Sequence, residues 1–165
     1  MKKAAAIPMT NALRALSAAG VAADVRMYAY TERGGTIQAA TLLGLDHHAT
    51  IKTIVLEDET KKPFVCLMHG DCEISLKNLA RARGCKTVAP CAPATADRHS
   101  GYHVGGTSPF GTKRAMTVYV QSTIYTLPEI YSNAGHRGLL VAMKPGDIDV
   151  VLAGRTVPVD VAIRG

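Results

Sequence analysis

Residues 101–111 of the chain read Gly-Tyr-His-Val-Gly-Gly-Thr-Ser-Pro-Phe-Gly, which is four glycines, one proline and three hydroxyl side chains in eleven positions. Glycine at positions 105 and 106 permits positive φ angles and lets a ligand approach the main-chain N–H groups closely. Pro109 stiffens the loop, so these donors are already aimed, as recognition of a carbonyl or phosphate group requires. The spacing matches neither glycine-rich fingerprint of the nucleotide-binding folds. From the residues alone, the stretch is either a ligand-binding loop or a tight connection between two elements.

The length and composition predict one globular domain spanning residues 1–165. A chain of 165 residues can bury one sizeable core and is too short for two domains of ordinary size. Hydrophobic residues make up 47% of it and charged residues 19%, which excludes a disordered or collagen-like chain. Since there is no tryptophan and there are only two phenylalanines, we expect a core of alanine, valine, isoleucine and leucine.

The chain has a net charge of +6, from 19 lysines and arginines against 13 acidic residues. This surplus suits a phosphate-bearing partner, whose counterions are released on binding, and equally an ordinary solvated basic surface. Pro8 and Thr10 interrupt the N-terminal apolar run that would otherwise resemble a secretory signal. No segment approaches the length of a membrane span. We therefore expect a cytoplasmic protein with no membrane partner.

The four cysteines contain no CxxC pair, and the six-residue gaps between them are poor zinc spacings. Without an export signal, they are expected to be free thiols in a reducing compartment. A zinc site would have to combine His69 and Cys72 with either His99 or His103, and no two ligands of either set are spaced i, i+4 on a helix. We therefore expect no metal and no cofactor.

Hydrophobic periodicity and capping residues predict a mixed α/β domain. The strands are expected over 24–30, 52–57, 64–69, 116–121, 139–143 and 157–163. The helices are expected over 11–19, 36–43, 75–83, 92–99 and 147–152, with a short helical turn over 127–131.

Three motifs in one chain of this length resemble the YbaK/EbsC family. They are the loop at 102–111, the turn Asn-Ala-Gly-His-Arg-Gly at 133–138, and Ile-Lys-Thr at 51–53. The family consists of free-standing relatives of the editing domain inserted in bacterial prolyl-tRNA synthetases. The resemblance covers nearly the whole chain and implies a barrel-like mixed sheet flanked by helices. It also implies hydrolysis of an aminoacyl ester at a tRNA 3′ end, in the branch that removes cysteine from tRNA(Pro), with prolyl-tRNA synthetase as a further partner.

The resemblance also implies the site residues. Lys52 matches the family's key functional lysine, which we expect to be catalytic and to face inward. A tyrosine of the first strand matches Tyr28, although Tyr30 lies close enough to be the alternative. The turn departs from the usual Gly-Gly-Lys-Arg-Gly, since it has His136 and is preceded by Asn133 where some members have serine. The implied substrate-binding residues are Tyr28, Thr53, Gly105, Gly106, Thr107, Ser108, Pro109, Asn133, Gly135 and Arg137.

No carboxylate or histidine of the sequence stands out as a general base. The chemistry is therefore expected to depend on the substrate's own thiol, on a terminal ribose hydroxyl or on bound water. In this mechanism the Lys52 ammonium holds the ribose–carbonyl region, and the loop N–H groups from Gly105 to Ser108 stabilise the developing oxyanion.

Two rival interpretations remain open. Cys72 could be a nucleophile activated by His69, although a half-buried cysteine at a turn is the commoner case. The protein could instead be a non-catalytic module that binds tRNA or a synthetase through its basic side chains. Those side chains are Lys77, Arg81, Arg83, Lys86, Lys113 and Arg114. The pair His47 and His48 is expected to be a solvated turn.

Overall fold

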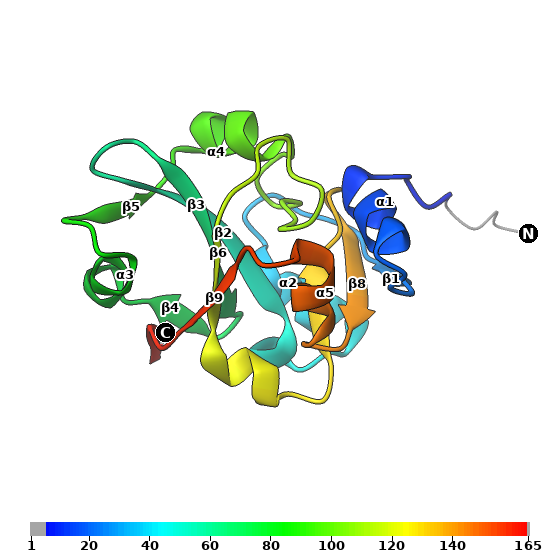
Figure 1. Cartoon of the computed structure of the whole chain (residues 1–165). Helices are drawn as coiled ribbons and strands as arrows, with labels where there is room; N and C mark the ends of the chain where they lie inside the picture. Colours follow the sequence, from blue (N-terminus) through cyan, green and yellow to red (C-terminus); the bar gives the residue numbers. More distant parts are fainter. Residues whose placement is uncertain (1–5, 165) are drawn as a thin grey trace, which may run out of the picture.

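An antiparallel strand pair occupies the centre of the molecule (Figure 1), where the sequence predicted two strands around a charged turn. The pair consists of β2 (Ile51–Asp58) and β3 (Pro63–His69). The computed structural model describes residues 6–164 of the chain. Every residue of β3 is buried, because other elements cover both of its faces.

The pair belongs to a five-stranded sheet with the order β5-β2-β3-β6-β9. β2 is antiparallel to both of its neighbours, whereas β3, β6 and β9 run parallel to one another. The three remaining strands are β5 (Val88–Pro90), β6 (Val118–Gln121) and β9 (Thr156–Val159).

The two faces of this sheet carry separate apolar clusters, because successive side chains of a strand point to opposite faces. On β3, Val65 and Leu67 join the larger cluster, whereas Cys66 and Met68 join the smaller one. The smaller cluster is covered by α3 and by β4 of a two-stranded sheet. The bounds of these elements are α3 (Leu76–Arg83), β4 (Cys72–Ile74) and β10 (Ala162–Arg164).

A third sheet, of order β1-β8-β7, packs with two helices on the larger cluster. The first helix lies beside β8 and contributes Leu13 and Leu16 (Figure 1). An isolated parallel bridge between Thr50 and Tyr131 connects β7 to the beginning of β2. The elements are β1 (Asp24–Met27), β7 (Ile130–Asn133), β8 (Leu139–Met143), α1 (Asn11–Ala18) and α5 (Asp147–Leu152).

The five predicted helices other than the turn over 127–131 are confirmed, and several of their ends carry the expected caps. The Thr10 hydroxyl accepts a hydrogen bond from the Leu13 amide at the start of α1, and Ser75 caps α3 in the same way. A left-handed glycine ends three of the helices. The remaining helices are α2 (Gly35–Leu43), α4 (Pro93–Ser100), η1 (His47–Ala49) and η2 (Ser122–Thr126).

Two predicted elements are wrong. The helical turn expected over 127–131 lies earlier, as η2, and Ile130 begins the strand β7, in which burial alternates. The strand expected over 157–163 is divided between β9 and β10, which belong to different sheets. The buried Gln121 side chain stabilises this division, because it donates to Asp160 (3.1 Å) and accepts from the Val161 amide (2.8 Å).

The described residues form three separate sheets, so the expected single barrel-like sheet is replaced by an open arrangement of sheets with flanking helices. The sequence missed β4 and β5, which are three residues long and too short to show a period. The strand expected over 24–30 ends at Met27. None of the helices within residues 6–164 has the length and apolar character needed to cross a membrane.

Candidate functional site

One edge of β2 is left without a strand partner over half of its length. β5 pairs with β2 only from Leu56 onward, and the bridge to Tyr131 lies at Thr50, so residues 51–55 have no neighbouring strand on this side among residues 6–164. The Val55 carbonyl faces this edge, because it accepts a hydrogen bond from the Cys91 amide (3.0 Å). Backbone groups of alternate residues point to the same edge. The amide and carbonyl of Thr53 therefore face the gap.

A cavity of about 850 Å³ fills this gap. That volume lies within the usual range of roughly 300–1,000 Å³ for small-molecule sites. Its walls come from the β2 edge, α2, the segment after β1, the start of α4 and the glycine-rich loop. Seven of the residues predicted from the sequence line it. They are Tyr28, Lys52, Thr53, Gly105, Thr107, Asn133 and Arg137.

Thr53 has an unusual hydroxyl. Its Oγ1 is the one buried side-chain nitrogen or oxygen in residues 6–164 that has no hydrogen-bond partner. A buried hydroxyl left unpaired costs on the order of 1–3 kcal/mol. The protein therefore keeps both the backbone and the side chain of Thr53 unpaired beside the cavity, which favours a role in binding.

Lys52 lies on the opposite face of β2 from Thr53, as strand alternation requires. Its ammonium donates to the Cys72 carbonyl (2.7 Å) and to the Glu73 carboxylate (3.4 Å), both on β4. The side chain is 22% exposed. Lys52 thus lines the cavity, but its amine is held by β4 and not by the glycine-rich loop, which differs from the expected inward-facing amine.

The mouth of the cavity is formed by Tyr30, Arg137 and the glycine-rich loop. The Arg137 guanidinium donates to the Val104 carbonyl (3.0 Å) and lies 5.3 Å from the centre of the Tyr30 ring. Gly105 has φ = +99°, and a Cβ there would overlap the Tyr30 hydroxyl. These contacts hold the loop and the turn at 134–138 together around the opening.

Two of the glycines expected to bind substrate lie against neighbouring segments and outside the cavity lining. A Cβ at Gly106 would lie 2.6 Å from the Arg137 amide nitrogen, so Gly106 lets two backbone segments meet. A Cβ at Gly135 would lie 2.6 Å from the Tyr102 ring. Neither residue lines the cavity.

The loop offers fewer free donors than its glycines suggest. The Gly106 amide donates to the His103 carbonyl (2.9 Å), and the fully buried Ser108 hydroxyl accepts from the Phe110 amide (3.1 Å). Ser108 and Pro109 do not line the cavity. Among the described residues, the amides of Gly105 and Thr107 have no protein acceptor and both residues line it. The expected set of oxyanion donors therefore narrows to these two.

Tyr28 and Tyr30 both line the cavity, so both remain candidates for the tyrosine that binds substrate. They follow the end of β1, where the Tyr28 amide donates to the Gly138 carbonyl (3.0 Å). Burial, with a smaller contribution from Tyr30, raises the pKa of the Tyr28 phenol. The Tyr28 hydroxyl therefore keeps its proton at neutral pH and can donate a hydrogen bond into the cavity. Asn133, at the end of β7, adds an amide to the same wall.

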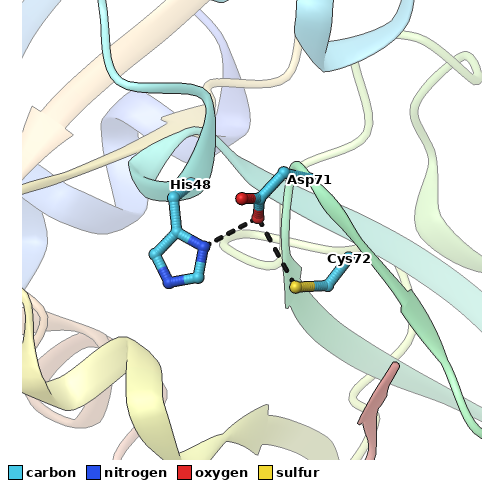
Figure 2. A group of neighbouring side chains, drawn as sticks. All are labelled: His48, Asp71 and Cys72. Atoms are coloured by element: carbon cyan, nitrogen blue, oxygen red, sulfur yellow. Dashed lines mark hydrogen bonds and ion pairs between the residues drawn. The ribbon is translucent and has the colours of Figure 1, made fainter. Parts of the chain in front are cut away.

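The histidine–cysteine pair considered as a nucleophilic site is not assembled. His69 is bonded to the His48 carbonyl (2.9 Å) and to the Thr123 hydroxyl (2.7 Å), and burial lowers its pKa. Burial, followed by contact with Asp71, raises the pKa of the Cys72 thiol. Cys72 is instead next to Asp71 and His48 (Figure 2), a group that the sequence missed.

The structure differs from the sequence-based expectation at the histidine pair and at one residue of the basic patch. The pair His47 and His48 is half-buried and bonded, since His47 contacts the Thr36 hydroxyl (2.9 Å) and lines the cavity. Arg83 is removed from the predicted basic patch, because its guanidinium pairs with Asp58 (3.0 Å) and lies over the Phe64 ring (4.2 Å).

The chain is similar to known proteins over most of its length. Residues 31–150 match the family model "Aminoacyl-tRNA editing domain". The chain is 29% identical over 137 residues to a protein of Enterococcus faecalis named "Putative Cys-tRNA(Pro)/Cys-tRNA(Cys) deacylase EbsC", covering 82% of this chain and 84% of that protein. It is 25% identical over 141 residues to a proline–tRNA ligase of Limosilactobacillus fermentum, covering 77% of this chain and only 25% of the ligase.

The fold has a counterpart among solved structures. A crystal structure described as "a putative trans-editing enzyme for prolyl tRNA synthetase" superposes with a TM-score of 0.79 at 19% identity, covering 93% of this chain and 99% of that one. At this identity the superposition shows a shared fold. With the family match over more than half of its length, the chain belongs to the aminoacyl-tRNA editing domain family.

Proposed function

We propose that this protein is a trans-editing aminoacyl-tRNA deacylase, acting in the cytoplasm, that hydrolyses mischarged tRNA, with Cys-tRNA(Pro) as its substrate. Family membership supports the reaction class, and the name of the Enterococcus relative supports the amino acid and the tRNA. Prolyl-tRNA synthetase is the proposed partner that supplies the mischarged tRNA.

The open edge of β2 is the observation that carries this proposal. An aminoacyl ester has an ammonium group that needs acceptors and a carbonyl that needs donors, and an unpaired strand edge offers both. The Thr53 carbonyl accepts from the substrate ammonium, and rotation about χ1 brings the Thr53 hydroxyl to the substrate side chain. The free amides of Gly105 and Thr107 lie on the same cavity and donate to the ester carbonyl oxygen.

The proposed reaction requires only that the protein hold the aminoacyl-tRNA substrate in a reactive conformation. The substrate thiol attacks its own ester carbon, so a carbon–sulfur bond forms and the ester carbon–oxygen bond breaks. The thiol proton passes to the departing ribose oxygen, and the product is a cyclic thiolactone that water later opens. Because the nucleophile belongs to the substrate, positioning supplies much of the rate enhancement. The loop amides stabilise the negative charge that develops on the carbonyl oxygen.

Lys52 can act without leaving β4. An ammonium has three N–H donors, and two of them are directed to Cys72 and Glu73. The third donor remains for the ribose–carbonyl region or a terminal phosphate of the tRNA. β4 thus holds the amine at one side of the cavity while the loop amides approach from another.

A panel of four charged tRNAs tests the function. Cysteinyl-, alanyl-, seryl- and prolyl-tRNA(Pro) are incubated with the protein, and loss of the aminoacyl group is followed over time. We expect rapid release of cysteine and little release of proline. A protein that binds every one of these tRNAs with a steep dependence on salt and deacylates none would be the non-catalytic module.

A further inference from the structure

A side-chain cluster outside the proposed deacylation chemistry has the composition of a metal site. His48 of η1, Asp71 of the β3–β4 turn and Cys72 of β4 each offer one ligand atom, and these atoms all lie within 4.8 Å of one another (Figure 2). The His48 Nδ1 lies 2.7 Å from the Asp71 carboxylate, and the Cys72 Sγ lies 3.5 Å from the same oxygen.

Gly70 allows these residues, which are distant in sequence, to lie close together in the fold. A Cβ at Gly70 would lie 2.6 Å from the His47 carbonyl oxygen, so only glycine allows the β3–β4 turn to pack on η1. The His48 ring is also fixed in place. It stacks on the His69 ring with a centroid separation of 3.7 Å, and the His48 carbonyl accepts from His69 Nδ1.

The donor set suits zinc. Imidazole nitrogen, carboxylate oxygen and thiolate sulfur bind Zn²⁺ at about 2.0–2.3 Å in a tetrahedron, which places ligand atoms about 3.3–3.8 Å apart. The Asp71–Cys72 distance of 3.5 Å already fits. The His48–Asp71 pair must open by less than 1 Å, and these side chains are 39% and 44% exposed, so movement and metal entry are not blocked. The bound metal displaces the thiol proton to solvent.

A second cluster provides a contrast. Glu57, Cys91 and His99 also place ligand atoms within 4.8 Å of one another. There, the Arg114 guanidinium lies 3.3 Å from His99 Nδ1, and a guanidinium can only donate. The neutral ring must therefore carry its proton on Nε2, which donates to Glu57 (3.3 Å) and is not available to a metal. No comparable donor approaches His48 within the described residues.

We propose that His48, Asp71 and Cys72 bind one divalent transition-metal ion, Zn²⁺ by the chemistry of the ligands, with water in the fourth position. The ion cross-links η1 to the β3–β4 turn. Its effect reaches the deacylation site through Lys52, whose ammonium bonds to the carbonyl of Cys72. The ion has a structural role and takes no part in breaking the ester.

Cobalt spectroscopy on the full-length, tag-free, reduced protein tests this directly. After chelator treatment, Co²⁺ is titrated in, followed by Zn²⁺. We expect one Co²⁺ per chain with sulfur-to-cobalt charge-transfer absorption, displacement of Co²⁺ by Zn²⁺, and a melting temperature that rises with either ion. Cys72→Ser should abolish the absorption, and the matched control Cys91→Ser should retain it.

Asp71→Asn gives a second arm, because this exposed side chain can change without disturbing a core. The variant keeps the sulfur, so the absorption should survive while Co²⁺ affinity falls at least about tenfold, the lower end of what loss of even an outer partner costs. Each variant's melting temperature without metal shows that it is folded. Failure of wild-type protein to bind Co²⁺ in large molar excess would overturn the proposal. So would absorption that persists in Cys72→Ser or unchanged affinity in Asp71→Asn.

Discussion

The ammonium of Lys52 lies 2.7 Å from the carbonyl oxygen of Cys72. This contact ties the lysine implied by the family resemblance to β4, a three-residue strand on the far side of β2 from Thr53. The position of the amine is therefore set by β4, while the position of the oxyanion donors is set by the glycine-rich loop. The two halves of the proposed site come from separate parts of the fold.

Lys52→Ala should lower the rate of Cys-tRNA(Pro) deacylation by more than about tenfold, which corresponds to ~1.4 kcal/mol of lost transition-state stabilisation. The melting temperature should change little, because the ion pair that is lost is partly exposed. Lys52→Arg should not restore the rate, since a planar guanidinium cannot reproduce the ammonium geometry. Lys77→Ala, on the exposed face of α3, is the matched control. Retention of more than a tenth of the rate in Lys52→Ala would remove Lys52 from the mechanism.

Thr53→Val should lower deacylation strongly and leave stability unchanged or slightly increased. Valine has nearly the shape of threonine, and its substitution removes a buried hydroxyl that has no partner. Thr53→Ser keeps the hydroxyl and should keep most of the activity. Urea unfolding and single-turnover deacylation of the three proteins check this. A marked loss of stability in Thr53→Val would mean that the hydroxyl has a structural partner.

The two loop glycines should respond differently to substitution by alanine. Gly106→Ala should destabilise the fold, because its Cβ meets the backbone of the turn at 134–138. Gly105→Ala should lower activity more than stability, because its Cβ meets the Tyr30 hydroxyl at the cavity mouth. The backbone strain at positive φ costs on the order of 1–2 kcal/mol.

Tyr30→Phe separates the effect of Gly105→Ala from that of Gly106→Ala, because it removes the hydroxyl that the Cβ of residue 105 would meet. In a double-mutant cycle, the Tyr30→Phe background should recover part of the stability and activity lost in Gly105→Ala. It should have no influence on Gly106→Ala. Equal behaviour of the two glycines in this cycle would mean that the loop serves only to connect two elements.

The β2–β3 strand pair and the helix caps could be predicted from the sequence because their signals are local. The apolar runs of β2 and β3 and the caps at Thr10 and Ser75 lie within a few residues of the structure they determine. The open edge of β2, where a barrel-like closure was expected, could not be predicted from the sequence, because it depends on how far β5 extends along β2. The division at Asp160 depends on Gln121, which lies 39 positions earlier.

The distinction between local sequence signals and long-range contacts also holds for the site. Lys52, Thr53 and the loop were found through motifs, and the structure places them on one cavity. The packing roles of Gly106 and Gly135 were not readable, since each depends on a segment about 30 residues away. His48 was interpreted as solvated because nothing local connects it to Asp71 and Cys72, which follow 23 and 24 residues later.

None of the four cysteines should be a nucleophile. Burial raises the pKa of all four thiols in the metal-free protein, to about 12 for Cys66 and about 11 for Cys91, so none of them is an activated thiolate there at neutral pH. When metal-free proteins are compared, replacing each cysteine singly by serine should leave turnover near wild type, apart from some loss of stability at the buried positions. Alkylation of the substrate thiol should, by contrast, slow release sharply. A covalent acyl group on a cysteine, detected by mass spectrometry, would contradict substrate-assisted chemistry.

The most direct test of the central claim compares cysteinyl-tRNA(Pro) with its S-methylated form, using wild-type protein and Thr53→Val. The rate constant for ester loss is measured under single-turnover conditions. The proposed function predicts fast release of cysteine by wild-type protein, with thiolactone or its hydrolysis product recovered, and slow release both from the methylated substrate and by Thr53→Val. Equal rates on the free and methylated substrates, or equal rates for the two proteins, would show that neither the substrate thiol nor the open edge of β2 carries the reaction.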